Sequence, residues 1–190
     1  MLIPFLSLMA VIVVLVTWFV VIYNRLVELR NMKDEGWSGI DVQLKRRSNL
    51  IPNLIETVKG YMVHERSVLE NITKLRSQTM NAGSVGSKMS AESSLSRILG
   101  NLFAVAENYP DLKANQNFID LQNQLSEIED EIQMARRYYN GTVRNLNVGI
   151  ETFPNSVVAG IFSFTTADFY ETVHESERTV PKIDFSASRP

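Results

Sequence analysis

The sequence has no cysteine and only two histidines, which excludes several kinds of site. Without a thiol the chain forms no disulfide bond and offers no thiolate ligand to zinc or an iron–sulfur cluster. It also has no cysteine on which a lipoprotein anchor could be attached. Any attachment to a membrane must therefore come from the polypeptide itself.

An excess of basic residues is missing as well. The 19 lysines and arginines are balanced by 21 aspartates and glutamates, which gives a net charge of −2. Proteins that bind duplex nucleic acid usually present a basic face and have a high isoelectric point. We therefore expect no nucleic acid among the partners of this protein.

Charged side chains are absent from the first 24 residues. A helix of about 20 apolar residues spans the roughly 30 Å hydrocarbon core of a bilayer. A cleaved signal peptide would have a basic start and a small-x-small cleavage site, and both are absent here. The pattern predicts an uncleaved transmembrane helix over residues 2–23, with Trp18 and Tyr23 near the interface. The alternative is a buried core helix.

The charges that follow this segment predict its orientation. Arg25, Arg30 and Lys33 come directly after it, whereas nothing basic precedes it except the α-amino group. Because lysine and arginine are enriched in cytoplasmic loops, we expect the N-terminus outside and the C-terminal domain in the cytoplasm.

Apolar residues recur at alternating spacings of three and four from Trp37 to Leu75. This period is typical of an amphipathic helix and not of a strand. The phase is preserved through Pro52, so we expect a kink within one helix and not a turn between two helices. Proline removes a backbone donor, and the carbonyl group freed near Ser48 is expected to be satisfied by the side chain of Ser48 or Asn49.

Two charged residues, Arg47 and Glu65, occupy positions of this apolar stripe. We expect Arg47 to reach an acid on a facing helix, either Glu65 or a carboxylate among residues 127–131. Its neighbours Lys45 and Arg46 point elsewhere and stay free for a partner.

The remaining chain predicts three further elements. Residues 81–93 are rich in glycine and serine and indicate a loop, after which a shorter helix runs from Ala91 to about Glu107. A long amphipathic helix extends from residue 118 to 153 and is closed by Pro154. Residues 157–171 are apolar and too short to span a bilayer, so we expect a short capping helix or loop there.

These elements predict an all-α fold, in which a single N-terminal transmembrane helix is followed by an antiparallel bundle of long helices of the four-helix type. The expected division is a transmembrane anchor over residues 1–24, a helical bundle over 25–172, and a polar, disordered tail over 173–190.

Sequence motifs for catalysis or metal binding are incomplete. His64 and Glu65 begin like the zinc motif H-E-x-x-H, but Val68 replaces the second histidine. Helical di-iron sites need Glu-x-x-His from two helices, and the spacing occurs only once, at Glu171 and His174. The carboxylates at residues 127–131 are read as a solvated acidic face. Arg136 and Arg137, beside two tyrosines, are expected to pair with acids on neighbouring helices. We therefore expect no catalytic, cofactor-binding or metal site, and no cofactor.

Several long motifs occur in the same order as in a known family. They are "YNRLVELRN", "WSGIDVQLKRRSNLIPNLIETVKGYMVHE", "ENYPDLKANQNFIDLQNQL", "ARRYYNGTVRNLN" and "FPNSVVAGIFSF". Through them, residues 23–171 resemble the LemA family of bacterial membrane proteins. The resemblance implies one N-terminal transmembrane helix, an N-out topology, a helical bundle, and no established enzymatic activity or catalytic residues. Gly36 departs from the alanine expected there, and "NSVVAGIFSF" lacks an expected glycine.

Three functions are compatible with this reading. The leading one is a non-enzymatic helical module, anchored in the bacterial inner membrane through residues 2–23, that binds or organises unidentified protein partners. The alternatives are a self-assembling, membrane-shaping factor, which would be a homo-oligomer, and a bundle enzyme that uses carboxylates such as Glu65 together with Arg47. The candidate interaction surface comprises Lys45, Arg46, Arg47, Tyr109, Asp111, Lys113, Arg136 and Arg137.

Overall fold

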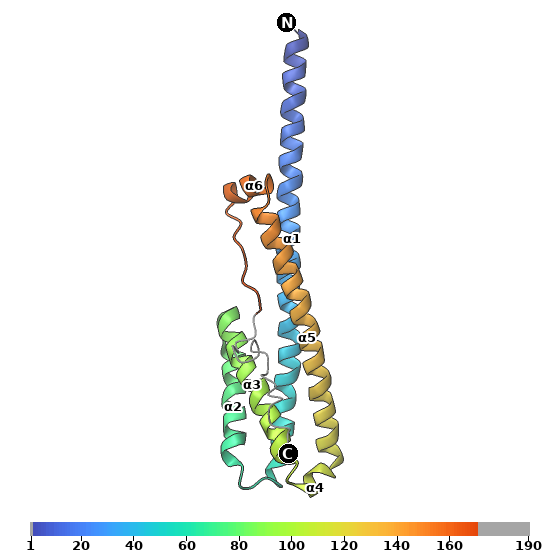
Figure 1. The fold of residues 1–190 in the computed structure, drawn as a ribbon, viewed down its shortest axis with the longest axis vertical. Helices are drawn as coiled ribbons and strands as arrows, with labels where there is room; N and C mark the ends of the chain where they lie inside the picture. The colour runs from blue at the N-terminus through green and yellow to red at the C-terminus, as the bar shows by residue number, and fades with distance from the viewer. Residues whose placement is uncertain (1, 171–190) are drawn as a thin grey trace, which may run out of the picture.

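The computed structural model describes residues 2–170, which form six α-helices and no strand within that range (Figure 1). The helices are α1 (Leu2–Lys59), α2 (Arg66–Asn81), α3 (Val85–Ala106), α4 (Pro110–Lys113), α5 (Gln116–Glu151) and α6 (Asn155–Ile161). The predicted all-α fold is confirmed, with one long apolar N-terminal helix that continues into a bundle. The predicted tail over 173–190 and its boundary, together with Glu171 and His174, lie outside the described residues.

The chain runs up and down the long axis of the molecule. α1 descends from the N-terminus, α2 returns beside it, α3 descends again, and α5 rises antiparallel to α1 (Figure 1). We call the part in which α2, α3 and α4 pack on residues 44–59 and 116–132 the head. The stalk is the narrower part above it, where residues 22–43 pair with residues 133–151, α6 and residues 162–170.

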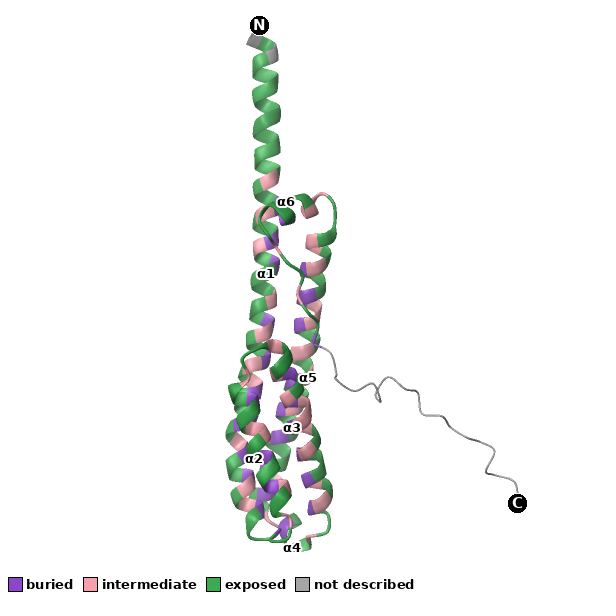
Figure 2. Ribbon diagram, turned by 90° about the vertical axis from the view of Figure 1, so that its left-hand side faces the viewer, coloured by how far each residue is buried: buried purple, intermediate pink, exposed green. Residues whose placement is uncertain are grey.

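The first turns of α1 stand apart from both regions (Figure 2). The described side chains from Ile3 to Val21 are exposed, apart from a half-buried Phe19. Burial begins at Ile22 and is complete at Leu26. The break between the apolar segment and the bundle is thus a change of environment along one helix, not a break in the helix.

The head has a continuous apolar core. Its fully buried residues come from all its long helices and include Ile51, Leu54, Ile72, Leu102 and Phe118. The stalk core is thinner and is built chiefly from α1 and α5.

The predicted helix from residue 37 to 75 is wrong at one place, because the chain turns over residues 60–65. Gly60 follows the last residue of α1, and glycine is among the residues least favourable to helix. Met62 in the turn is buried against the same core as Val58 and Leu69. The apolar spacing therefore continues across the turn because both helices face one core.

The predicted loop over residues 81–93 is also wrong, because only residues 82–84 separate α2 from α3. The backbone nitrogen of Ser87 donates to Ser84 Oγ at 3.2 Å, and that of Ser84 donates to Ser87 Oγ at 3.1 Å. This reciprocal capping starts the helix at Val85. The serines that indicated a loop serve instead as a helix cap.

α1 continues through Pro52 without a break, which confirms one helix there; the kink itself stays a prediction. The expected local repair is wrong. The free carbonyl of Ser48 accepts a hydrogen bond from Arg76 Nε of α2, at 2.7 Å. The Ser48 hydroxyl is buried and has no partner among the described residues. The proline thus creates an acceptor through which α2 is attached to α1.

Candidate functional site

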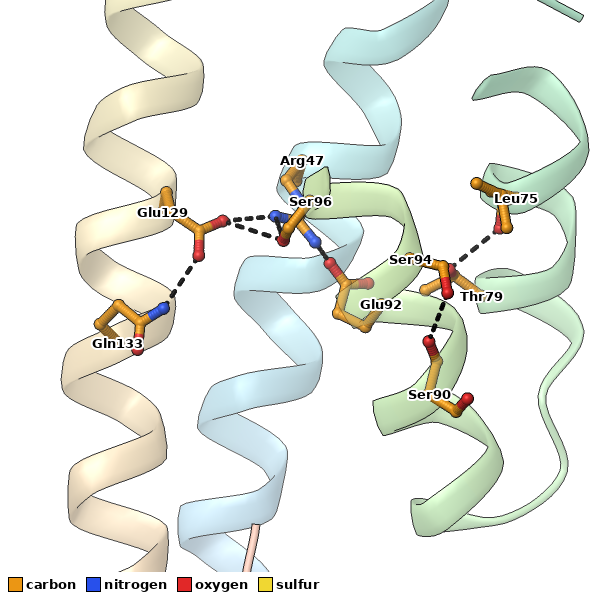
Figure 3. Close-up of polar contacts among 9 residues, drawn as sticks. All are labelled: Arg47, Leu75, Thr79, Ser90, Glu92, Ser94, Ser96, Glu129 and Gln133. Atoms are coloured by element: carbon orange, nitrogen blue, oxygen red, sulfur yellow. Dashed lines mark hydrogen bonds and ion pairs between the residues drawn. The ribbon is translucent and has the colours of Figure 1, made fainter. Parts of the chain in front are cut away.

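A buried ionic cluster joins three helices at the boundary between head and stalk. Arg47 of α1 is only 2% exposed and forms ion pairs with Glu92 of α3 and Glu129 of α5 (Figure 3). Its Nη1 lies 2.5 Å from Glu129 Oε2 and donates to Ser96 Oγ at 2.8 Å. The guanidinium group therefore ties α1, α3 and α5 together at one level.

Further contacts fix the carboxylate of Glu129. Ser96 Oγ donates to Glu129 Oε2 at 3.4 Å, and Gln133 Nε2 donates to Glu129 Oε1 at 3.0 Å (Figure 3). The expectation that Arg47 pairs with an acid among residues 127–131 is confirmed by Glu129. The alternative partner Glu65 is wrong, because it lies at the start of α2 as its N-cap residue.

The two carboxylates of the cluster differ in their access to water. The side chain of Glu92 is 1% exposed and that of Glu129 is 35% exposed. Burial lowers the pKa of Arg47 to about 10, and the charge of Glu129 opposes that shift. Arg47 stays protonated at neutral pH, so it is the charge that compensates buried Glu92.

A cavity of about 400 Å³ opens beside this cluster, between α3 and α5. Arg47, Ser96 and Glu129 supply charged and polar groups at its wall. The other lining residues are Leu99, Gly100, Phe103, Gln122, Leu125 and Ser126. The cavity is large enough for a small molecule with one polar end, but Arg47 and Glu129 already form an ion pair with one another there.

Two asparagines of α5 hold the extended segment that follows α6. Asn140 donates to the Tyr170 carbonyl at 3.0 Å and accepts from its backbone nitrogen at 2.7 Å. Asn147 makes the same two contacts with Ala167, each at 2.9 Å. Seven helical residues rise about 10.5 Å, and three extended residues span about 10 Å, so the two spacings match.

These asparagine contacts place the Tyr170 side chain near Arg47 and Glu129 of the ionic cluster. The Arg136 guanidinium carbon lies 4.6 Å from the centroid of the Tyr170 ring, a cation–π contact. Burial raises the pKa of Tyr170, and the charge of Arg136 opposes that shift. Arg136 therefore stacks on an aromatic ring, where sequence analysis expected pairing with an acid.

The eight candidate interaction residues do not form one surface. Arg47 is buried in the ionic cluster, so its assignment to a surface is wrong, and Arg136 is half-buried against Tyr170. Tyr109, Asp111 and Lys113 belong to the turn around α4, at the end of the head farthest from the N-terminus (Figure 1). The other exposed cations of the set lie elsewhere along the bundle: Lys45, Arg46 and Arg137.

Two candidate kinds of reactive site can be checked against residues 2–170: a metal site and the pair of Glu65 with Arg47. Within this range, no group of three or more histidines, aspartates and glutamates is placed to hold a metal ion. The proposed enzymatic pair of Glu65 and Arg47 is not assembled, since Arg47 is engaged by Glu92 and Glu129.

Four residues that make these polar contacts were not predicted from the sequence: Arg76, Glu92, Asn140 and Asn147. Glu92 was hidden because it falls in the segment read as a loop. The asparagines carried a usable signal, since two amides seven residues apart lie on one face of a helix. No periodicity could have assigned Arg76 to the carbonyl that Pro52 leaves free.

Comparisons with known proteins agree with this architecture. A sequence profile of the LemA family matches residues 36–185. Protein LemA of Metamycoplasma hominis is 28% identical over 166 residues, which cover 87% of this chain and 74% of that protein.

Two magnetosome proteins are also similar to this chain. Magnetosome protein MamQ 2 of Paramagnetospirillum magneticum is 24% identical over 175 residues, which cover 78% of this chain but only 64% of the relative. Magnetosome protein MamQ of Magnetospirillum gryphiswaldense is 23% identical over 184 residues, covering 83% of this chain and 68% of that protein. The exposed apolar segment of α1 and these similarities together indicate a membrane location. The profile match covers most of the sequence, and this chain belongs to the LemA family.

Proposed function

We propose that this protein is a non-enzymatic helical bundle, anchored in the bacterial inner membrane, that binds or organises partner proteins there. Residues 2–23 form its membrane span, the N-terminus lies outside, and the head faces the cytoplasm. The observation that carries the proposal is that one helix, α1, supplies both the exposed apolar segment and a core element of the head. A protein built in this way holds its head at a fixed distance from the bilayer.

The arrangement of charge supports a binding role more than catalysis. The buried charges of the ionic cluster are paired with one another and tie the helices together, whereas Lys45, Arg46 and Arg137 stay exposed to solvent. Complementary charge mainly guides encounter and specificity between proteins. The turn around α4 is the part of the head most distant from the membrane, where a soluble partner meets the least obstruction.

Topology is tested by fusing a fluorescent protein or alkaline phosphatase to the C-terminus. The proposal requires a fluorescent fusion and an inactive phosphatase, because phosphatase is active only after export. An active phosphatase fusion would reverse the orientation while leaving the span intact.

Partner binding is tested in cells with a photo-crosslinking amino acid at Arg46, Tyr109 or Arg137. Glu56 supplies the matched control, since it is exposed on α1 but lies outside the candidate surface. We expect a reproducible adduct from at least one candidate position, its loss in an Arg46→Glu or Asp111→Lys background, and none from Glu56. Adducts between two copies would favour the self-assembling alternative, and no adduct from any position would contradict both.

A further inference from the structure

The segment around α6 leaves large apolar side chains exposed beside the membrane span. Phe153 is 79% exposed, Val157 54% and Ile161 62%. Val157 and Ile161 are four residues apart on α6 and share one face of it, and Phe153 lies in the turn that precedes the helix. A water-soluble surface would not ordinarily gather such side chains.

The opposite face of α6 fixes its height along α1. Val158 and Ala159 are buried against Ile22 and Leu26. The Phe162 ring centroid lies 5.8 Å from that of Phe19 and 4.6 Å from that of Tyr23. The segment therefore packs on the last uncharged turns of α1, since Arg25 is the first charged residue of the chain.

The composition of this segment matches that position. Residues 152–167 contain no aspartate, glutamate, lysine or arginine. The guanidinium carbon of Arg30 lies 5.4 Å from the Phe164 ring centroid, and Arg30 follows the apolar segment of α1 in the direction of the head. A cation that follows aromatic residues at the end of an apolar span is typical of a membrane interface.

We propose that α6 and its flanking phenylalanines form a second membrane contact, inserted into the interface of the same leaflet in which α1 ends. α6 lies across the direction of α1 (Figure 1), so it lies along the bilayer surface when α1 crosses the bilayer. The exposed face of α6, made by Val157 and Ile161, enters the boundary between headgroups and acyl chains together with the exposed Phe153 of the preceding turn, as interfacial helices do. The occupant of this face is lipid, because α6 packs on Phe19, Ile22 and Tyr23, where the exposed apolar segment of α1 ends.

The second contact would give the bundle a defined orientation on the membrane. A single helix leaves the protein free to tilt and to rotate about its axis, whereas two points of insertion restrict the tilt and select one side of the stalk. This inference rests on the proposed span, so the test must report on the two separately.

The absence of cysteine makes that test clean, because each introduced cysteine carries the only spin label. The full chain is prepared as Ile161→Cys or Val157→Cys and reconstituted with one copy per lipid nanodisc, which prevents contact with a second copy. Accessibility to oxygen and to a water-soluble nickel chelate is then measured by power saturation. Val14→Cys, in the apolar segment, and Val63→Cys, at the far end of the head, give references that are 66% and 71% exposed in the structure.

We expect labels at 157 and 161 to be several-fold less accessible to nickel than the label at 63, and to approach the label at 14. Nickel accessibility at both α6 positions equal to that at 63, with 14 protected, would overturn the second contact and leave the span standing. A label at 14 that is open to nickel would overturn the span and the second contact together. Thermal unfolding followed by circular dichroism checks that each labelled variant is folded.

Discussion

The head and the stalk are built on the same two helices, α1 and α5, but these helices are packed differently in the two regions. In the head, α2 and α3 complete a four-helix core in which Leu54, Ile72 and Leu102 are fully buried. In the stalk, of α2 and α3 only the first turn of α3 reaches α1, through Met89 beside Ile40, and α1 and α5 approach each other closely instead. A Cβ atom on Gly36 would lie 3.2 Å from the Tyr139 Cα, and one on Gly149 would lie 2.8 Å from a methyl group of Leu29.

In the stalk, side-chain amides also hold a segment of backbone through hydrogen bonds, whereas the head is held together by buried apolar side chains. The amides of Asn140 and Asn147 hold the segment over residues 167–170, which covers one side of the helix pair. An extended segment buries less apolar area than a helix, so its hydrogen bonds must carry more of the attachment. We therefore expect the stability of the head to depend on the volume of its buried side chains. The stability of the stalk should depend on the close approach of α1 and α5 and on its hydrogen bonds.

The largest expected effect lies at the boundary between the two regions, in Arg47→Leu. This change leaves Glu92 buried without its compensating charge, and loss of one partner of a buried pair costs about 3–5 kcal/mol. Urea unfolding of the full chain in detergent, followed by circular dichroism, measures the change in free energy of unfolding.

The matched control is the double variant Arg47→Leu with Glu92→Leu. Removing both charges replaces the pair by apolar contacts, and such replacements are often neutral or stabilising. We expect the double variant to recover most of the loss, with Glu129 turning toward water. Equal losses in the single and double variants would show that packing, not charge, holds the three helices at this level.

The second effect compares two fully buried leucines of α1, Leu54 in the head and Leu26 in the stalk. Truncation to alanine removes the same atoms, but the residual cavity differs. We expect Leu54→Ala to cost about 3–5 kcal/mol and Leu26→Ala about 2–3 kcal/mol, because a two-helix core can collapse around the gap. Unfolding in the same detergent decides between them. A larger loss at Leu26 would mean that the stalk, with α6 packed on it, is the more rigid region.

The helical class and the buried position of Arg47 could be predicted from sequence because they follow from periodicity. Arg47 occupies a position of the apolar stripe of α1, which predicts that its side chain is buried. A buried charge is expected to pair with an acid on a facing helix. Glu129 belonged to the candidate group over residues 127–131, which flanks the core position Ile128 of α5, but periodicity did not single it out within that group. The apolar run before Arg25 identified the candidate span for the same reason.

The turn at residues 60–65 and the start of α3 could not be predicted by periodicity. A stripe tells which residues face a core but not whether two helices share that core, so the turn at Gly60 left the spacing undisturbed. Ser84 and Ser87 are equally suited to a loop and to a capping box, and only the reciprocal hydrogen bonds decide. The attachment of Arg76 to the Ser48 carbonyl depends on tertiary packing, which local sequence does not encode.

At alkaline pH, the stalk and the buried ionic cluster are expected to change in stability in opposite directions. Burial raises the pKa of Tyr139, and Asp168 and Asp34 add to the shift. Its stabilising contribution is therefore complete below the ordinary tyrosine value of about 10 and is lost as the pH rises through the raised value. For Arg47 the sign is opposite. Its folded pKa of about 10 lies below the ordinary arginine value, so its contribution to stability rises as the pH increases from about 10 toward that ordinary value.

Unfolding free energies of Tyr139→Phe at pH 9 and pH 11 test the tyrosine contribution. The variant loses the hydrogen bond from the hydroxyl to the Asp168 carbonyl at both pH values, which gives a constant offset. We expect it to lose less stability than the wild type between pH 9 and pH 11. Tyr138→Phe is the control, since its ring is exposed on the same turn of α5. An unchanged pH dependence in Tyr139→Phe would remove Tyr139 from the alkaline response of the stalk.

The smallest effect tests close approach within the stalk, through two glycines of α1 that lie one turn apart. A Cβ atom on Gly39 meets nothing within 4 Å, so Gly39→Ala should stabilise the protein by about 0.5–1 kcal/mol through helix propensity alone. Gly36→Ala has the same propensity gain, but its methyl group presses on the Tyr139 backbone, which gives way only if α5 moves. We expect a gain near zero there. Gains of equal size would show that the helix pair adjusts freely and that close approach is not what holds the stalk together. Loss of stability in Gly36→Ala alone would place the contact between α1 and α5 among the most constrained in the molecule.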